Sequence, residues 1–197
     1  AVEKAVRETA GQVMSYQNRP ALTLYHSTCG GIRVPNNVIF GGEALSYLKG
    51  GQDGEKNKVL CRESPHFGPW QVSLSSNELA KAFEMENLVD ISLERLPSGY
   101  AKKVSLRGNP PKKLDAYPFW LKLGASFGWS EVKSLNFSVK KEGDRFVFTG
   151  KGMGHGVGLC QWGARKMALD GSNYRKILSH YFPGTTLVPA SRLEARR

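Results

Sequence analysis

Apolar and polar residues alternate along several short stretches of the chain, which is the pattern of a half-buried strand. These stretches are residues 12–16, 21–25, 70–74, 104–106, 135–139 and 146–148. Turn-forming residues separate the first pair at Asn18-Arg19-Pro20 and the last pair at Lys141-Glu142-Gly143-Asp144. The pattern therefore predicts short antiparallel β-hairpins.

Helical signals follow the strands. Ser75 and Glu78 form a Ser-x-x-Glu capping box, which predicts a helix of about three turns after the strand at 70–74. A helical period after residue 159 stops at Gly171, and Ser172 or Asn173 caps a last helix whose apolar positions are Tyr174, Ile177, Leu178 and Tyr181. Hairpins and separate helices without βαβ alternation predict an α+β fold of short antiparallel sheets and a few packed helices.

Length and charge narrow the function classes. At 197 residues the chain is one large domain or two small ones, and no apolar run is long enough to span a bilayer. A net charge of +11 favours nucleic acid, anionic lipid or an acidic cell-wall polymer as partner. The basic residues are dispersed and no nucleic-acid-binding motif is present, so we expect no nucleic-acid partner.

A glycine-rich stretch is the first candidate site. Five glycines alternate from Gly150 to Gly158 around His155, and Gln161 and Trp162 follow. Glycine at every second position lets another backbone or a ligand approach closely. The stretch is either a binding site or a tight turn in which His155 is only a satisfied polar residue.

A second candidate lies where residues 25–31, Tyr-His-Ser-Thr-Cys-Gly-Gly, end a strand. After a long loop-like segment, Cys61 and His66 follow, so His26, Cys29, Cys61 and His66 make a possible tetrahedral zinc set. A disulfide between Cys29 and Cys61 is the competing interpretation, and a buried strand end without either is the third. The sequence leaves these alternatives open.

These blocks together resemble the family of stage II sporulation protein D and LytB, the amidase enhancers. The resemblance rests on residues 9–13, 25–31, 61–66, 135–137, 154–164 and 180–185, which span nearly the whole chain. It implies an extracytoplasmic, cell-envelope protein that binds peptidoglycan glycan strands, with a cell-wall amidase as a further partner. It also implies zinc near the His-Ser-Thr-Cys-Gly-Gly block, and Cys160 packed in the helix after the glycines.

The resemblance further implies lytic transglycosylase chemistry, in which a glutamate protonates the bond between N-acetylmuramic acid and N-acetylglucosamine and an anhydro ring then closes. The family's glutamate precedes the first matching block, so we expect it upstream of Ala1 and name no catalytic residue in this chain. The missing initiator Met favours a trimmed fragment over a naturally short protein. The expected organisation is one domain over residues 1–197, with a frayed basic tail at 190–197.

The resemblance places substrate between two lobes, in a cleft with two walls. The first wall comprises Tyr25, Ser27, Thr28, Gly30 and Gly31, and the second Gly154, His155, Gly156, Gln161 and Trp162. Three hypotheses remain: a transglycosylase domain without its general acid, a non-catalytic wall-binding amidase enhancer, and a zinc-stabilised structural domain whose glycines serve only the fold.

Overall fold

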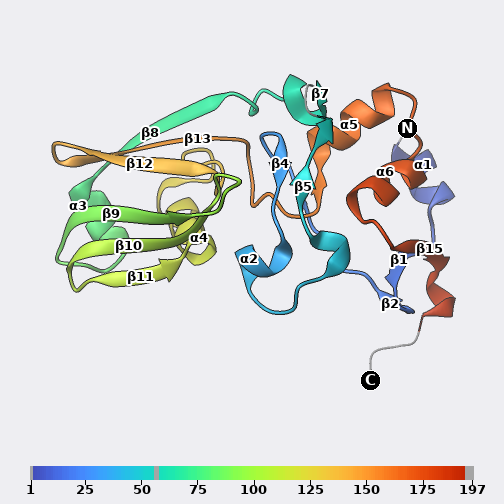
Figure 1. Cartoon of the computed structure of the whole chain (residues 1–197), viewed down its shortest axis with the longest axis horizontal. Coiled ribbons are helices and arrows are strands. Elements are labelled where there is room, and N and C mark those ends of the chain that lie inside the picture. The colour runs from blue at the N-terminus through green and yellow to red at the C-terminus, as the bar shows by residue number, and fades with distance from the viewer. Residues whose placement is uncertain (1, 56–57, 194–197) are drawn as a thin grey trace.

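The computed structural model describes residues 2–55 and 58–193. Figure 1 shows an elongated molecule with regular sheets toward its two ends and short strands and loops between them. We divide it into a sheet lobe (residues 69–151), a terminal lobe (residues 2–20 and 161–192) and a middle segment (residues 21–68 and 152–160). The predicted α+β class is confirmed.

The sheet lobe contains two three-stranded antiparallel sheets, ordered β12-β13-β8 and β11-β10-β9. Its strands are β8 (Pro69–Ser75), β9 (Asn87–Arg95), β10 (Ala101–Asn109), β11 (Lys112–Asp115), β12 (Phe137–Glu142) and β13 (Arg145–Lys151). Helices α3 (Ser76–Ala82) and α4 (Ala116–Phe127) pack with them. Phe119 of α4 stacks on Phe83 at 4.9 Å between ring centroids and also packs against Phe137 and Phe148.

The terminal lobe joins the two ends of the chain in one sheet, because β1 (Gln12–Tyr16) pairs with both β15 (Thr186–Pro189) and β2 (Arg19–Pro20). Its helices are α1 (Val2–Glu8), α5 (Gln161–Leu169), α6 (Tyr174–Tyr181) and the 3-10 helix η3 (Ala190–Arg192). Residues 190–192 of the predicted frayed tail are thus helical, whereas residues 194–197 lie outside the described residues.

The middle segment has very short elements. They are β3 (Tyr25–His26), β4 (Ile32–Arg33), α2 (Asn36–Phe40), η1 (Ser46–Leu48), β5 (Gly51–Gln52), β6 (Gly54–Glu55), β7 (Lys58–Val59), η2 (Leu60–Glu63) and β14 (Leu159–Cys160). β14 pairs in parallel with β3, which joins the two sequence blocks that carry the candidate sites. Residues 32–60, expected to be a long loop, contain most of these elements.

Two local predictions need correction. The first hairpin turns at Gln17 and Asn18, which both have positive φ, so the chain pairs again at Arg19 and Pro20 instead of turning there. Asn tolerates this conformation, and Pro20 lies in an edge strand, where proline is accepted. The helix after the capping box covers seven residues, about two turns, and ends at Ala82, with Phe83 as its C-cap before the positive φ of Glu84.

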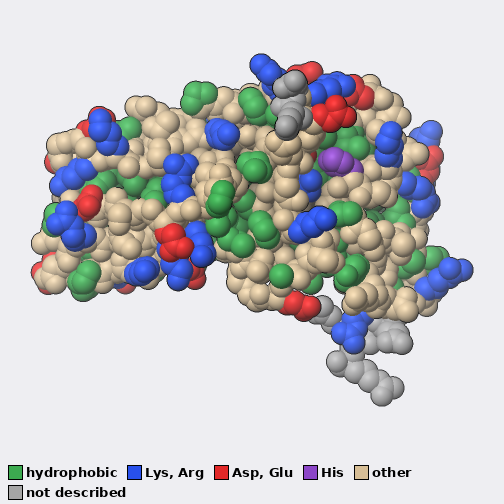
Figure 2. Space-filling model, viewed as in Figure 1, with side chains coloured by type: hydrophobic (Ala, Val, Ile, Leu, Met, Phe, Trp, Pro, Cys, Tyr) green, Lys and Arg blue, Asp and Glu red, His purple; other side chains and the backbone are tan. Residues whose placement is uncertain are grey.

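The surface carries its positive charge broadly. Figure 2 shows Lys and Arg side chains spread over one whole face, with apolar patches between them. Across residues 2–55 and 58–193, no helix has the length and apolar character needed to cross a membrane.

Candidate functional site

The glycines after β13 are explained by close packing against the middle segment. Gly152 has φ 80°, and a Cβ there would lie 2.6 Å from the Thr28 carbonyl oxygen. Gly158 has φ 76°, and its Cβ would lie 2.1 Å from the carbonyl oxygen of Leu24. Both distances are to backbone, which cannot move aside as a flexible side chain can. The glycine pattern therefore joins residues 152–158 to residues 24–28.

This packing places two histidines beside each other. His26 is buried and its Nδ1 donates to the Val157 carbonyl at 3.1 Å, since a carbonyl only accepts. Burial, helped by the nearby His155, lowers the pKa of His26 to about 3, so its ring is neutral. Burial also lowers the pKa of His155, whose Nδ1 accepts from the Val157 N–H. The ring centroids of His26 and His155 are 5.6 Å apart.

An open groove lies beside Phe40, which His155 contacts. Its ring lies edge-on to Phe40 at 5.2 Å, and Phe40 lies edge-on to Tyr117 at 4.7 Å, so three rings follow one another. Phe40 ends α2 in the middle segment, whereas Tyr117 is in the first turn of α4 in the sheet lobe. The groove beside them has a volume of about 530 Å³ and is lined by Leu22, Leu24, Asn36, Phe40, Gly41, Glu43, Leu45 and Tyr117.

The groove wall is fixed by a buried amide. Asn36 donates to the Glu43 carbonyl at 2.8 Å and accepts from the Leu45 N–H at 3.0 Å, which holds the 41–45 loop beside α2. The Glu43 side chain itself is exposed at the groove. An aromatic row, aliphatic side chains and a few polar groups on an open groove suit a sugar chain, which presents both apolar ring faces and hydroxyls.

The predicted substrate residues occupy different environments. Tyr25 is exposed and Ser27 is partly exposed, whereas Thr28 is fully buried, with its hydroxyl 2.6 Å from that of Ser64. Thr28 therefore acts in packing. Gln161 and Trp162 begin α5, where the Trp162 N–H donates to the Ser27 carbonyl at 3.2 Å.

The four glycines singled out with these residues act through the backbone. Gly30 and Gly31 turn the chain with positive φ, and Gly154 packs on His26. Gly156 packs on Tyr100 and accepts from the Val34 N–H at 2.9 Å. Among all ten predicted substrate residues, His155 is the one whose ring contacts the aromatic row of the groove.

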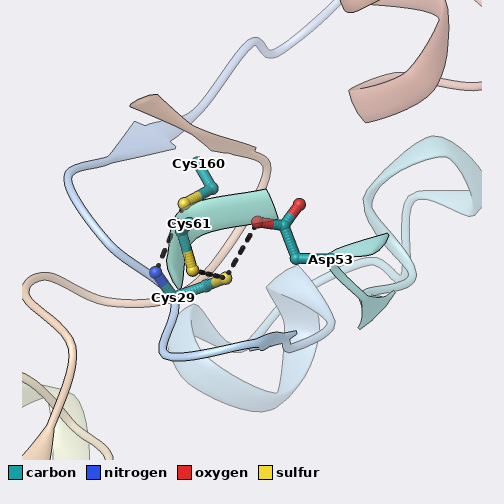
Figure 3. Close-up of side chains that lie close together, drawn as sticks. All are labelled: Cys29, Asp53, Cys61 and Cys160. Atoms are coloured by element: carbon teal, nitrogen blue, oxygen red, sulfur yellow. Dashed lines mark hydrogen bonds between the residues drawn. The ribbon is translucent and has the colours of Figure 1, made fainter. Parts of the chain in front are cut away.

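The three cysteines meet at a second, buried centre (Figure 3). Cys29 Sγ lies 3.5 Å from Cys61 Sγ and 3.3 Å from Asp53 Oδ2, to which the thiol donates. Cys160, the residue before α5, brings its sulfur to the same place, and the four ligand atoms lie within 4.8 Å of one another. The prediction that Cys160 packs in the following helix is wrong, because β14 directs it back toward Cys29.

The predicted metal set is thus brought together only in part. Cys29 and Cys61 of the predicted set lie together. Their other two neighbours are Asp53 and Cys160, in place of the predicted His26 and His66. The His26 Nδ1 donates to the Val157 carbonyl, and the backbone N–H of His66 donates to the Ser64 hydroxyl. All three cysteines are free thiols, so the proposed Cys29–Cys61 disulfide is not formed in this structure.

Charge in this centre is tightly constrained. Burial raises the pKa of Asp53, although Arg33 lies close, with its Nε 3.8 Å from Asp53 Oδ1. The neighbouring Cys160 sulfur, followed by the Cys29 sulfur, lowers the pKa of Cys61. The hydrogen bond with Cys160 raises the pKa of Cys29. The pKa values of Cys29 and Cys61 therefore shift in opposite directions.

Sequence reasoning missed Asp53, Phe40 and Tyr117. Asp53 follows a two-residue strand in a polar run, where an acidic residue is ordinarily solvated. A weak signal for Phe40 existed, because a large aromatic directly before Gly41-Gly42 in a loop-like stretch has little local reason to be there. Tyr117 lies in the first turn of α4, a helix that the hydrophobic pattern above does not predict.

The chain matches curated proteins over nearly its whole length. It is 32% identical over 198 residues to an uncharacterized protein of Brachyspira hyodysenteriae, covering 98% of this chain and 50% of that protein. It is 28% identical to stage II sporulation protein D of Bacillus amyloliquefaciens (96% and 51% covered). It is 25% identical to the amidase enhancer of Bacillus subtilis (94% and 32% covered). No protein-family model matches the chain.

These matches support the resemblance seen in the motifs. The chain is a member of the SpoIID/LytB family, to which stage II sporulation protein D and the amidase enhancer belong. It spans about half the length of the first curated relatives it matches, and about a third of the amidase enhancer.

Proposed function

We propose that this chain is a cell-envelope domain that binds the glycan strands of peptidoglycan. The observation that carries the proposal is the row His155–Phe40–Tyr117 beside an open groove between the middle segment and the sheet lobe. Aromatic side chains offer apolar surface to the apolar faces of sugar rings. Family membership supports the proposal, because the relatives are named for sporulation and for enhancing an amidase.

The electrostatics of the chain suit such a partner. A net charge of +11 attracts an acidic wall polymer and speeds the encounter with it. Beside the groove, burial lowers the pKa of His155, which favours its uncharged ring next to Phe40. The groove thus contributes shape and hydrogen bonding, while the dispersed Lys and Arg residues contribute attraction.

Cleavage of the strand is the finer part of the proposal. A lytic transglycosylase needs a general acid at the glycosidic oxygen, which then acts as base on the muramoyl 6-hydroxyl. Of the groove-lining residues described above, Glu43 is the one carboxylic acid. Glu43 is therefore the candidate general acid that the groove offers, and a carboxylate that these 197 residues do not include is the alternative.

A second candidate function is that of a non-catalytic wall-binding domain that enhances an amidase. The similarity to the amidase enhancer over 94% of this chain favours it. Both candidates require glycan binding at the same groove, and they differ only in whether the strand is cut.

The test is binding and digestion of glycan strands stripped of their stem peptides. We expect His155→Ala and Phe40→Ala to weaken binding at least tenfold in calorimetry at a temperature where each variant is folded. Tyr174→Ala is the matched control, since Tyr174 is an exposed aromatic at a different groove. Full binding by both groove variants would refute the proposal.

Digestion separates the two candidates. Mass spectrometry for anhydro-muramoyl ends is applied to this chain, to its Glu43→Gln variant and to a version extended upstream. If only the extended version produces anhydro-muramoyl ends, the general acid lies outside this chain. If the Glu43→Gln variant no longer produces these ends, Glu43 is the general acid. Binding without any such ends favours the amidase-enhancing role.

A further inference from the structure

The cysteine centre has a composition that packing does not explain. Its four groups come from separate parts of the chain: the loop before β4, the turn between β5 and β6, η2, and the end of β14. They are Cys29, Asp53, Cys61 and Cys160, and all four are buried. Three thiols and a carboxyl group are directed at one point, and the Arg33 guanidinium lies beside the carboxyl group, with its Nε 3.8 Å from Asp53 Oδ1.

The distances match a tetrahedral metal site. Zinc binds cysteine sulfur at about 2.3 Å in tetrahedral geometry, which puts neighbouring sulfurs about 3.8 Å apart. The observed distances are 3.5 Å between Cys29 Sγ and Cys61 Sγ and 3.3 Å between Cys29 Sγ and Asp53 Oδ2, and all four atoms lie within 4.8 Å. A disulfide would join only two of the sulfurs and leave the third thiol and the carboxylate unexplained.

The surroundings are arranged for thiolates. The Cys29 N–H donates to Cys160 Sγ at 3.4 Å and the Gly31 N–H donates to Cys29 Sγ at 3.4 Å, which stabilises negative sulfur. Three thiolates and one carboxylate around Zn²⁺ leave two net negative charges, and the Arg33 guanidinium beside Asp53 offsets one of them. The absence of a side chain at Gly163 of α5 leaves space for the Asp53 carboxylate, since a Cβ at Gly163 would lie 2.6 Å from Asp53 Oδ2.

We propose that Cys29, Asp53, Cys61 and Cys160 bind one Zn²⁺ ion in a closed, tetrahedral, structural site. Soft thiolate ligands select zinc over magnesium or calcium, and four protein ligands leave no open position for substrate. The ion ties together segments that share few regular hydrogen bonds, and it fixes the loop before β4 against the start of α5. This site is separate from the groove, and its test is independent of glycan binding.

The test is metal content and the cobalt spectrum of the 197-residue chain, kept reduced throughout. We expect one zinc per chain by mass spectrometry of the metal. With Co²⁺ in its place, we expect the intense visible bands of a tetrahedral site together with sulfur-to-cobalt charge transfer in the near ultraviolet. Asp53→Asn should weaken zinc binding at least tenfold against a chromophoric chelator and shift the cobalt bands, and Cys160→Ser should remove part of the charge-transfer intensity.

Two control variants distinguish the alternatives. Asp90→Asn changes a solvent-accessible aspartate of the sheet lobe and should leave metal binding unchanged. His66→Ala should also leave it unchanged, whereas loss of metal in His66→Ala with retention in Asp53→Asn would overturn the ligand set in favour of the histidines.

The wild type alone also decides the matter if a variant fails to fold. Bound zinc should protect all three thiols from alkylation until a chelator is added. A reduced chain that takes up neither zinc nor cobalt, or thiols that react equally with and without metal, would overturn the proposal.

Discussion

The sheet lobe and the middle segment are stabilised in different ways. In the sheet lobe, six strands of four to nine residues form regular antiparallel ladders over a core of stacked phenylalanines. In the middle segment, each strand is two residues long and the loops are joined by glycine contacts, buried polar groups and the cysteine centre. Both candidate sites depend on the middle segment.

The difference shows where function is built in this fold. A long ladder with an apolar core is stable by itself but leaves little freedom to place polar groups. Short strands and turns can direct His155, Phe40 and the cysteines to chosen points, provided that other contacts hold them. Tyr100 couples the two regions, because it comes from the sheet lobe and its hydroxyl donates to the Cys29 carbonyl at 3.0 Å.

The largest effect is expected from the core of the sheet lobe. Phe119→Ala removes a fully buried ring that contacts three other phenylalanines, and it should lower the free energy of unfolding by about 3–5 kcal/mol. Val89→Ala, at an exposed position of β9, is the control and should cost less than about 1 kcal/mol. Equal costs in denaturant titration would mean that this core does not dominate the lobe's stability.

A smaller effect is expected from a glycine of the middle segment. Gly158→Ala places a Cβ against the Leu24 carbonyl at positive φ, and we expect a loss of about 2–3 kcal/mol. Gly143→Ala in the β12–β13 turn is the matched control, because it has positive φ but open space around the Cβ, and should cost about 1 kcal/mol. Similar losses for both would show that close packing is not the reason for Gly158.

The buried histidine gives a pH-dependent effect. The pKa of His26 is about 3 in the folded protein against 6.5 ordinarily, so the unfolded chain takes up the proton first. The neutral His26 ring contributes its full stabilisation of the folded state above the ordinary pKa of 6.5, and this contribution is lost as the pH falls toward 3. Between about pH 6 and pH 4, unfolding free energy should fall by about 1.4 kcal/mol per pH unit more steeply in the wild type than in His26→Gln. Parallel pH profiles would contradict this assignment.

The smallest effects are expected at the helix caps of the two outer lobes. Ser75 accepts from the Glu78 N–H in the sheet lobe, and Asn173 accepts from the Lys176 N–H in the terminal lobe. Replacing either residue with Ala should cost about 1 kcal/mol in thermal or chemical unfolding. Ser138→Ala, at an exposed position of β12, is the control and should cost less than half as much. Cap variants as stable as this control would show that the capping hydrogen bonds contribute nothing measurable.

The sequence predicted the features that depend on neighbours along the chain. The strand before Ser75, the capping box, the hairpin at residues 141–144 and the Asn173 cap were all recognisable, because each depends on a few adjacent residues. β9 and β11 were not recognised, because exposed polar residues dilute their alternation.

The candidate sites depend on contacts between distant residues. His155 could be singled out from its glycines, but its neighbour Phe40 is more than a hundred residues earlier in the chain. The pairing of Cys29 with Cys61 could be proposed from residue chemistry alone. Asp53 and Cys160 could not, since only the parallel pairing of β14 with β3 and the turn after β5 bring them to the same point.

The most direct test of the account is where a glycan binds on the folded chain. In an NMR titration with a glycan oligosaccharide that lacks stem peptides, the account predicts chemical-shift changes at His155, Phe40 and Tyr117 and along residues 22–24. Changes confined to the separate groove around Gln12 and Tyr174, or no saturable changes at all, would contradict it.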